Sequence, residues 1–81
     1  MDKKYILYVN MDCPFCKKAV SLLEKNDENF SILNLKKRPR VLQELKEIYN
    51  WYTVPMVFER RDSEIKFIGG FTDLSERLTN V

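Results

Sequence analysis

The sequence predicts a single α/β domain in which a four-stranded mixed sheet carries three helices packed on both faces. Short apolar runs of strand length alternate with segments whose apolar residues recur at helical spacing. A polar turn separates the last two apolar runs, which is typical of a hairpin. A chain of 81 residues has room for one hydrophobic core, so we expect one domain over residues 1–81.

The first half of the chain predicts a strand, a helix and a second strand. Residues 4–9 form an uninterrupted apolar run, which suits a strand buried on both faces. A helix is expected from Pro14 to about Asn26, because the missing N–H of a proline costs nothing in the first turn. Residues 30–35 are expected to form the second strand. The apolar side chains on one stripe of the helix are Cys16, Ala19, Val20 and Leu23.

The second half predicts a helix, a hairpin and a final helix. Pro39 begins a segment whose apolar residues recur three and four apart as far as Tyr52. Residues 56–59 and 65–68 are expected to form two short strands on either side of a polar turn at 60–63, which predicts an antiparallel hairpin.

The final helix follows a glycine pair that interrupts the last strand. Its apolar residues Phe71, Leu74 and Leu78 recur at helical spacing. Thr72 or Asp73 can cap its start, and Glu76 lies three residues after Asp73, as in a capping box.

The predicted order is β-α-β-α-β-β-α. A right-handed crossover makes the first two strands parallel, and the hairpin adds two antiparallel strands. This order is that of the minimal thioredoxin fold.

The two cysteines of the chain, Cys13 and Cys16, form a C-x-x-C pair where a strand gives way to a helix. That placement is typical of a thioredoxin-like redox motif. Cys13 is expected at the open end of the helix, where free N–H groups and the helix dipole favour a thiolate. Lys17 and Lys18 add positive charge nearby. Cys16 follows one turn later, close enough to form a disulfide, so the pair points to thiol–disulfide exchange.

Composition excludes several classes of site. The chain has no histidine, which removes Cys–His catalytic pairs and imidazole metal ligands. A single C-x-x-C supplies two of the four ligands that a structural zinc site needs, so we expect no metal site.

Basic residues cluster in the middle of the chain, but the net charge is only +2. Nucleic-acid-binding domains are usually more basic, so we expect a solvated loop and helix start and no nucleic-acid partner. The clustered residues are Lys36, Lys37, Arg38 and Arg40.

No apolar run approaches the ~20 residues that span a bilayer. The N-terminus lacks a small-residue cleavage site, so we expect neither a secretory signal nor a membrane partner. We therefore expect a cytoplasmic protein, in a reducing compartment where a C-x-x-C pair is more often catalytic or metal-binding than structural.

Three blocks of the sequence resemble those of dithiol glutaredoxins, a family of the thioredoxin superfamily. Cys13-Pro14-Phe15-Cys16 is similar to the family's active-site motif, and Thr53-Val54-Pro55 to its cis-proline loop. Gly69-Gly70-Phe71-Thr72-Asp73 is similar to its glycine-pair loop. The blocks appear in the family's order, and the resemblance covers essentially the whole chain.

The resemblance implies a glutathione-dependent oxidoreductase that reduces protein disulfides and glutathione mixed disulfides. Cys13 is the expected nucleophile and Cys16 the resolving thiol. Pro14, Phe15, Lys17 and Pro55 are expected to support the active site, with Pro55 in the cis form. The residues expected to contact glutathione, here a co-substrate rather than a tightly bound cofactor, are Thr53, Val54, Pro55, Gly70, Thr72 and Asp73.

The chain departs from the family where the glycine carboxylate of glutathione is held. Asn10 stands where the family usually has a lysine, and Trp51-Tyr52 stand where it commonly has glutamine or arginine. Lys36, Lys37 and Arg38 are candidates to replace the missing basic contacts. Phe15 replaces the commoner tyrosine and keeps the ring without its hydroxyl.

The expected partners are glutathione and proteins that carry a disulfide or a glutathionylated cysteine, and we expect a monomer. One alternative is a glutaredoxin-like electron donor, for example to ribonucleotide reductase, that is itself reduced by thioredoxin reductase. An alternative of another class is an iron–sulfur cluster carrier, in which Cys13 and glutathione hold a cluster between two subunits.

Overall fold

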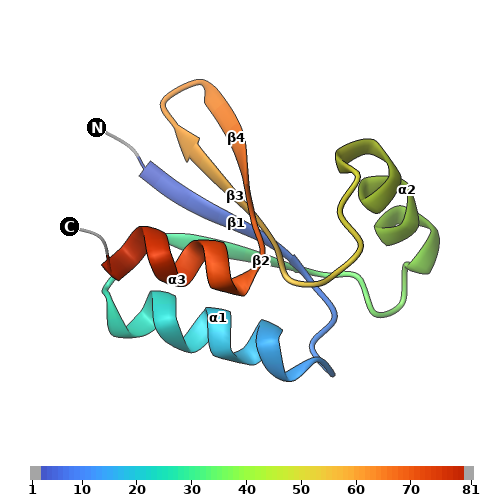
Figure 1. Cartoon of the computed structure of the whole chain (residues 1–81), viewed down its shortest axis with the longest axis horizontal. Helices are drawn as coiled ribbons and strands as arrows, with labels where there is room; N and C mark the ends of the chain where they lie inside the picture. Colours follow the sequence, from blue (N-terminus) through green and yellow to red (C-terminus); the bar gives the residue numbers. More distant parts are fainter. Residues whose placement is uncertain (1–2, 80–81) are drawn as a thin grey trace.

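The structure is a computed structural model that describes residues 3–79 and contains four strands and three helices. Figure 1 shows α1 and α3 side by side, with α2 apart from them at one end of the sheet. In chain order the elements are β1 (Lys3–Val9), α1 (Pro14–Lys25), β2 (Phe30–Asn34), α2 (Pro39–Tyr49), β3 (Met56–Arg61), β4 (Glu64–Gly69) and α3 (Phe71–Thr79).

The strands form one mixed sheet in the order β2-β1-β3-β4. β1 and β2 are parallel, as a crossover through α1 requires, and β1–β3 and β3–β4 are antiparallel. The predicted thioredoxin fold is therefore confirmed. The C-terminal end of β1 and the N-terminal end of β3 meet at one edge of the molecule, and the loops that follow and precede them lie there together.

The main core lies between the sheet and the pair α1 and α3. Tyr5, Leu7 and Val9 alternate along β1 and are at most 1% exposed, because they point toward the helices. The helices and β3 complete this core with Cys16, Ala19, Leu23, Val57 and Leu74. One of the two cysteines is thus a core residue.

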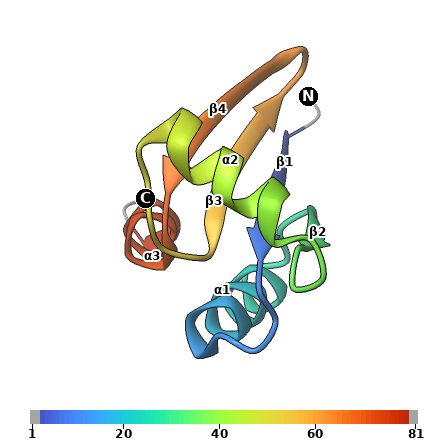
Figure 2. The same cartoon turned by 90° about the vertical axis from the view of Figure 1, so that its right-hand side faces the viewer.

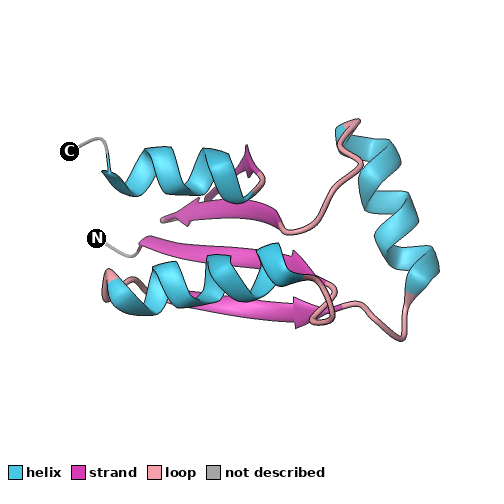
Figure 3. Cartoon of the chain, turned by 60° about the horizontal axis from the view of Figure 1, so that its bottom comes forward, coloured by secondary structure: helices cyan, strands magenta, loops and turns pink. Residues whose placement is uncertain are grey.

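The opposite face of the sheet carries aromatic side chains and is covered only at one end. Figure 3 shows α2 beyond the ends of the strands, and Figure 2 shows it crossing in front of them. No residue of α2 is buried. The Tyr49 ring reaches the sheet, with its centroid 5.0 Å from that of Phe58 and 5.2 Å from that of Phe67.

Two helix boundaries differ from the sequence prediction. α2 ends at Tyr49, and Tyr52 lies outside it, because Asn50 adopts a left-handed conformation with φ 51° that stops the helix. α3 begins at Phe71, so neither Thr72 nor Asp73 is the residue that precedes the helix. Asp73 instead reaches back to the chain before the helix, as described below.

The hairpin is tighter than predicted. Arg60 and Arg61 belong to β3 and pair with Ile65 and Glu64, so the turn shrinks to two residues. Asp62, the first residue of that turn, has φ 58°, a conformation that aspartate tolerates better than most residues.

A buried carboxylate fastens α3 to the sheet. Glu59 on β3 is 6% exposed and lies 2.8 Å from the guanidinium of Arg77 on α3 and 3.6 Å from that of Arg61. The hydrogen bond to Glu59 raises the pKa of Arg77 above its usual value. Arg77 lies in the last turn of α3, so this pair links that end of the helix to β3.

Among the described residues, no helix has the length and apolar character needed to cross a membrane.

The two glycines before α3 should respond differently to substitution. Gly69 has φ +132°, and an added Cβ would collide with the carboxylate of Asp73. An added Cβ at Gly70 would meet Trp51 at 3.4 Å, an ordinary van der Waals contact. We expect Gly69→Ala to lower the free energy of unfolding by about 1–3 kcal/mol, and Gly70→Ala to change it by less. Urea unfolding of both variants tests this, and equal losses would contradict it.

Candidate active site

Cys13 occupies the position immediately before α1. Its backbone is extended (φ −84°, ψ 126°), and Pro14 begins the helix. Asn10 shapes the loop that leads to it, because its carbonyl accepts a hydrogen bond from the Cys13 N–H at 2.9 Å. The side-chain oxygen of Asn10 also accepts one from the Asp12 N–H at 3.0 Å. Asn10, which stands where the family usually has a lysine, therefore helps to hold the loop of residues 10–13, which we call the cysteine loop.

The first turn of α1 favours the thiolate of Cys13. The backbone N–H of Cys16 is the largest cause that lowers the Cys13 pKa, and the N–H of Phe15 contributes as well. Partial burial opposes them. Both N–H groups belong to the first turn of α1, where the helix dipole also favours negative charge. The Cys16 N–H donates to the Cys13 carbonyl at 3.1 Å, and the Cys13 side chain makes no capping hydrogen bond.

Cys16 has the opposite environment, one turn further along α1. It is fully buried in the core, and burial raises its pKa to about 11. The charge of Cys13 is a smaller cause of the same rise. Both cysteines are free thiols. Cys13 is therefore the thiol that ionises more readily, and Cys16 lies beside it in the protonated form.

The loop before β3 lies against Cys13. The Cys13 thiol donates to the Val54 carbonyl across 3.8 Å. The Val54–Pro55 peptide bond is cis, as the family resemblance predicts, and Pro55 is fully buried. Backbone atoms of residue 54 are thus available next to the reactive sulfur.

A pocket of about 320 Å³ opens beside this loop and the start of α3. Five residues predicted to contact glutathione line it, together with Phe15 from the cysteine motif. Trp51 and Phe71 complete its wall. The lining residues are Phe15, Trp51, Thr53, Val54, Gly70, Phe71, Thr72 and Asp73.

The sequence prediction of this pocket was incomplete in two respects. Pro55 lies beneath the loop and does not line the pocket. Phe71 was not among the residues predicted to contact glutathione, yet it borders the pocket, with its ring centroid 6.0 Å from that of Phe15. A sequence signal for Phe71 was present, since it lies inside the glycine-pair block.

The start of α3 presents hydrogen-bond donors to the pocket. Asp73 Oδ2 accepts from the Gly70 N–H at 3.0 Å, which is one half of a capping box. The first N–H groups of the helix, including those of Thr72 and Asp73, have no intrahelical acceptor. The pocket therefore combines a donor-rich helix start with a carboxylate whose Oδ1 makes no hydrogen bond within residues 3–79.

Trp51 contributes a buried donor to the same pocket. Its indole Nε1 is inaccessible to water and has no hydrogen-bond partner within residues 3–79. A buried N–H without an acceptor costs about 1–3 kcal/mol. The cost would be offset if a bound molecule supplied an acceptor.

The charged residues near Cys13 are placed differently from one another. Lys18 Nζ lies over the Phe15 ring, 5.1 Å from its centroid, and Lys17 is exposed. The amides of α1, rather than these lysines, lower the pKa of Cys13. Lys36 reaches the cysteine loop and pairs with Asp12 at 3.0 Å, so one of the three candidate basic residues lies beside this loop.

No group of three or more histidine, cysteine, aspartate or glutamate side chains in residues 3–79 is placed to hold a metal ion.

Comparison with known proteins identifies similar sequences and folds. The sequence model of the Glutaredoxin family matches residues 6–62. The solution structure of glutaredoxin from Brucella melitensis is 24% identical, with a TM-score of 0.64, over 89% of this chain and 74% of that one. A crystallised mutant of the thioredoxin-like protein BC3987 is 26% identical, with a TM-score of 0.64, over 95% of both chains. No curated protein matches the chain.

The two thiols should titrate far apart. Thiolate absorbance at 240 nm, followed against pH, should show Cys13 in Cys16→Ser ionising below the ordinary thiol pKa of about 8.5, because backbone N–H groups stabilise its charge. Cys16 in Cys13→Ser should ionise well above that value, since burial is the main cause that raises its pKa. A Cys13 that stays protonated into the alkaline range would contradict this assignment.

Proposed function

The chain belongs to the glutaredoxin family and is a thiol–disulfide oxidoreductase, and we propose that glutathione supplies its electrons. The observation that carries this proposal is the pocket beside Cys13. Its polar groups are the free N–H groups at the start of α3, the carboxylate of Asp73 and the backbone of Thr53 and Val54. Glutathione, which carries an α-carboxylate, an ammonium group and peptide groups, has the complementary set.

The γ-glutamyl end of glutathione fits the start of α3. Its carboxylate would accept from the free N–H groups of Thr72 and Asp73, where the helix dipole also favours an anion. Its ammonium would lie by Asp73, whose Oδ2 is already engaged with Gly70. The cysteine of glutathione would then extend toward Cys13, along the backbone of Val54 in the manner of an added strand.

The glycine end of glutathione would meet different groups from those usual in the family. Asn10 is occupied within the cysteine loop, so it is not a replacement for the lysine. The Trp51 indole N–H is a neutral donor in the pocket wall. We propose that the Trp51 indole turns when glutathione binds, so that its buried Nε1 becomes exposed and donates to a carbonyl or carboxylate of glutathione, and that Lys36 attracts the carboxylate at longer range.

A protein disulfide would be reduced in two exchange steps. The Cys13 thiolate attacks one sulfur of the substrate, and the other sulfur leaves with the electron pair. Forming the mixed disulfide removes the negative charge of Cys13, which is one cause of the raised Cys16 pKa. Cys16 then ionises more readily and displaces the reduced substrate, which leaves a Cys13–Cys16 disulfide. Two glutathione molecules reduce that disulfide and become oxidised glutathione.

A glutathionylated protein would need Cys13 alone. Cys13 takes the glutathionyl group and releases the protein thiol, and a second glutathione attacks the mixed disulfide. Cys16 takes no part in this route. The partners we propose are therefore glutathione and proteins with a disulfide or a glutathionylated cysteine, in a reducing compartment such as the cytoplasm, with the enzyme acting as a monomer.

Thioredoxin reductase is a second candidate electron source. The absence of basic side chains at Asn10 and Trp51 favours it, because these positions would otherwise bind the glycine carboxylate. Disulfide reduction with NADPH and thioredoxin reductase, compared with NADPH, glutathione reductase and glutathione, distinguishes the two. Anaerobic cluster reconstitution tests the iron–sulfur carrier, which would form a coloured dimer.

The cysteine variants separate the two routes. In a coupled assay with glutathione and glutathione reductase, Cys13→Ser should lose both activities, because the remaining thiol, Cys16, is buried and has a raised pKa. Cys16→Ser should lose protein-disulfide reduction and keep the removal of glutathione from a glutathionylated peptide. Activity of Cys13→Ser above the uncatalysed rate would refute the assignment of the nucleophile.

Trp51→Phe tests the proposed donor to glutathione. In the Cys16→Ser background, the equilibrium between Cys13 and oxidised glutathione should shift by roughly two- to tenfold toward the free thiol, the worth of one hydrogen bond. Tyr52→Phe is the matched control, because it removes a hydroxyl from the exposed neighbour, which does not line the pocket. An equal shift in both variants, or none in Trp51→Phe, would count against the donor.

A further inference from the structure

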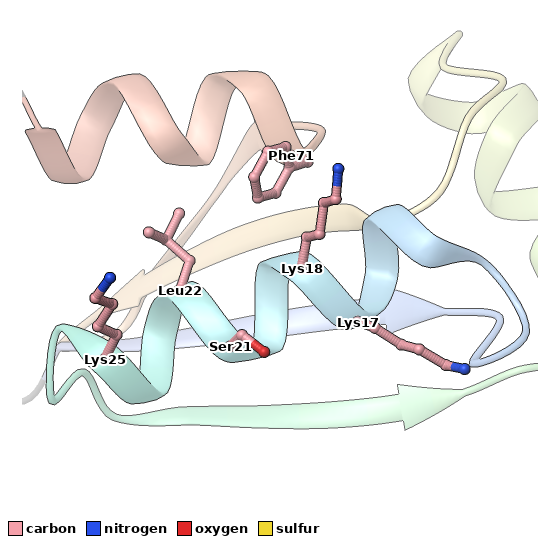
Figure 4. Close-up of a pocket in the computed structure, with 6 residues that line it drawn as sticks. All are labelled: Lys17, Lys18, Ser21, Leu22, Lys25 and Phe71. Carbon is pink, nitrogen blue, oxygen red and sulfur yellow. The ribbon is translucent and has the colours of Figure 1, made fainter.

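A second hollow lies between α1 and α3, on the side of Phe71 away from the active-site pocket. We name it the α1–α3 groove, and its volume is about 360 Å³. Figure 4 shows its lining side chains, mostly from α1, with Phe71 above them from the start of α3. The lining residues are Lys17, Lys18, Ser21, Leu22, Lys25 and Phe71.

The groove is positively charged and has an apolar wall. Lys18 and Lys25 rise on either side of Leu22 (Figure 4), and no acidic side chain among the described residues lines it. Neither lysine makes a salt bridge within residues 3–79, whereas Lys3 and Lys36 are both paired with carboxylates. These ammonium groups are therefore available to a partner.

Part of this charge is placed where the helix itself disfavours it, whereas Lys25 lies in the last turn of α1, where the dipole favours a cation. Lys17 and Lys18 belong to the first turns of α1, where the helix dipole destabilises cations, and α1 has no acidic residue in its first turn. Lys18 is held there by the face of Phe15. An anionic partner would gain from both the lysines and the helix end.

The groove continues into the site of the chemistry. Phe71 lines both the groove and the active-site pocket, and its ring lies beside that of Phe15, which follows Cys13 by two residues. A polypeptide whose cysteine reacts with Cys13 can therefore pass over Phe71 and along α1.

We propose that the α1–α3 groove binds an acidic, extended segment that flanks the reactive cysteine of a protein substrate. This inference rests on the proposed thiol exchange at Cys13 and names the class of protein substrate. Lys18 and Lys25 are seven residues apart on α1, so their Cα atoms are about 10 Å apart along the axis. An extended segment places every second side chain on one face, about 7 Å apart. Acidic side chains four residues apart, about 13 Å, therefore reach the two flexible lysines, and the residue midway between them is an apolar one that packs on Leu22 and Phe71.

The test uses three peptides whose single cysteine forms a disulfide with thionitrobenzoate. They differ only in flanking residues, which are glutamates, glutamines or lysines. The Cys13 thiolate of reduced Cys16→Ser attacks the peptide sulfur, a Cys13–peptide disulfide forms, and thionitrobenzoate leaves with the electron pair. Its absorbance reports the rate, and glutathione takes no part.

The acidic peptide should react roughly three- to tenfold faster than the glutamine peptide at low ionic strength, as expected for contacts with exposed charges. The lysine peptide should react more slowly than the glutamine peptide. The preference should fade at high salt, since exposed charges are screened.

The matched variants locate the preference. Lys18→Glu with Lys25→Glu should abolish or invert the ratio of acidic to glutamine peptide rates. Lys4→Glu with Lys66→Glu changes the net charge equally on β1 and β4, outside the groove, and should keep the ratio. Because each ratio is taken within one variant, an effect of Lys18 on the reactivity of Cys13 cancels.

Three results would overturn the proposal. They are equal rates for the acidic and glutamine peptides, a ratio that survives the groove variant, and a ratio that both double variants lower equally. Inhibition by an oligonucleotide but not by an acidic peptide without cysteine would assign the groove to phosphates instead. Failure of the proposed exchange itself would look different, because no peptide would then release thionitrobenzoate.

Discussion

Cys13 lies at the amino end of α1, where the backbone N–H groups of Phe15 and Cys16 lower the pKa of its thiol, and the reactivity we propose for the site depends on this interaction. The chain has no histidine, so these backbone groups stabilise the thiolate without an imidazole beside it. Each pKa unit by which the thiol is lowered corresponds to about 1.4 kcal/mol of preference for the charged form. The same helix turn places Cys16 in the core, where no water stabilises its charge.

The pocket beside Cys13 depends on elements far apart in the sequence. The loop that ends in cis-Pro55 brings Val54 to the sulfur, and the glycine pair turns the chain so that α3 begins beside that loop. Gly69 has the positive φ that this turn needs, and Asp73 fills the space where a side chain on Gly69 would lie. The ion pair between Glu59 and Arg77 holds α3 against β3. Stability and ligand recognition are therefore joined at the start of α3.

Charge is distributed unevenly around the active site. On one side of Phe71 the pocket offers amides, a carboxylate and an indole N–H, and on the other side the α1–α3 groove offers ammonium groups over an apolar wall. In our proposals, glutathione and a protein segment are recognised by different surfaces that meet at one aromatic ring. Separate surfaces allow specificity for a protein substrate to change without loss of the small co-substrate.

The sequence alone determined the local features of this protein. Apolar periodicity fixed the order of strands and helices, and the spacing of Cys13 and Cys16 after a strand identified the redox pair, because both depend on neighbours within a turn or two. The family resemblance added the cis-Pro55 loop and the glycine-pair block. These signals were sufficient for the fold and for five of the residues that line the pocket.

The tertiary structure decided what depends on contacts between distant segments. The left-handed conformation of Asn50 ends α2 at Tyr49, and Trp51 therefore lies outside the helix, in the wall of the pocket. The apolar spacing, which predicted a helix as far as Tyr52, did not indicate this end. Phe71 continued the apolar pattern of α3, yet packing placed it between two binding surfaces. The environments that separate the Cys13 and Cys16 pKa values, and the groove beside α1, exist only once α1 is packed on the sheet and α3 lies next to it. Burial and proximity are properties of the folded chain, because they arise between residues that sequence order keeps apart.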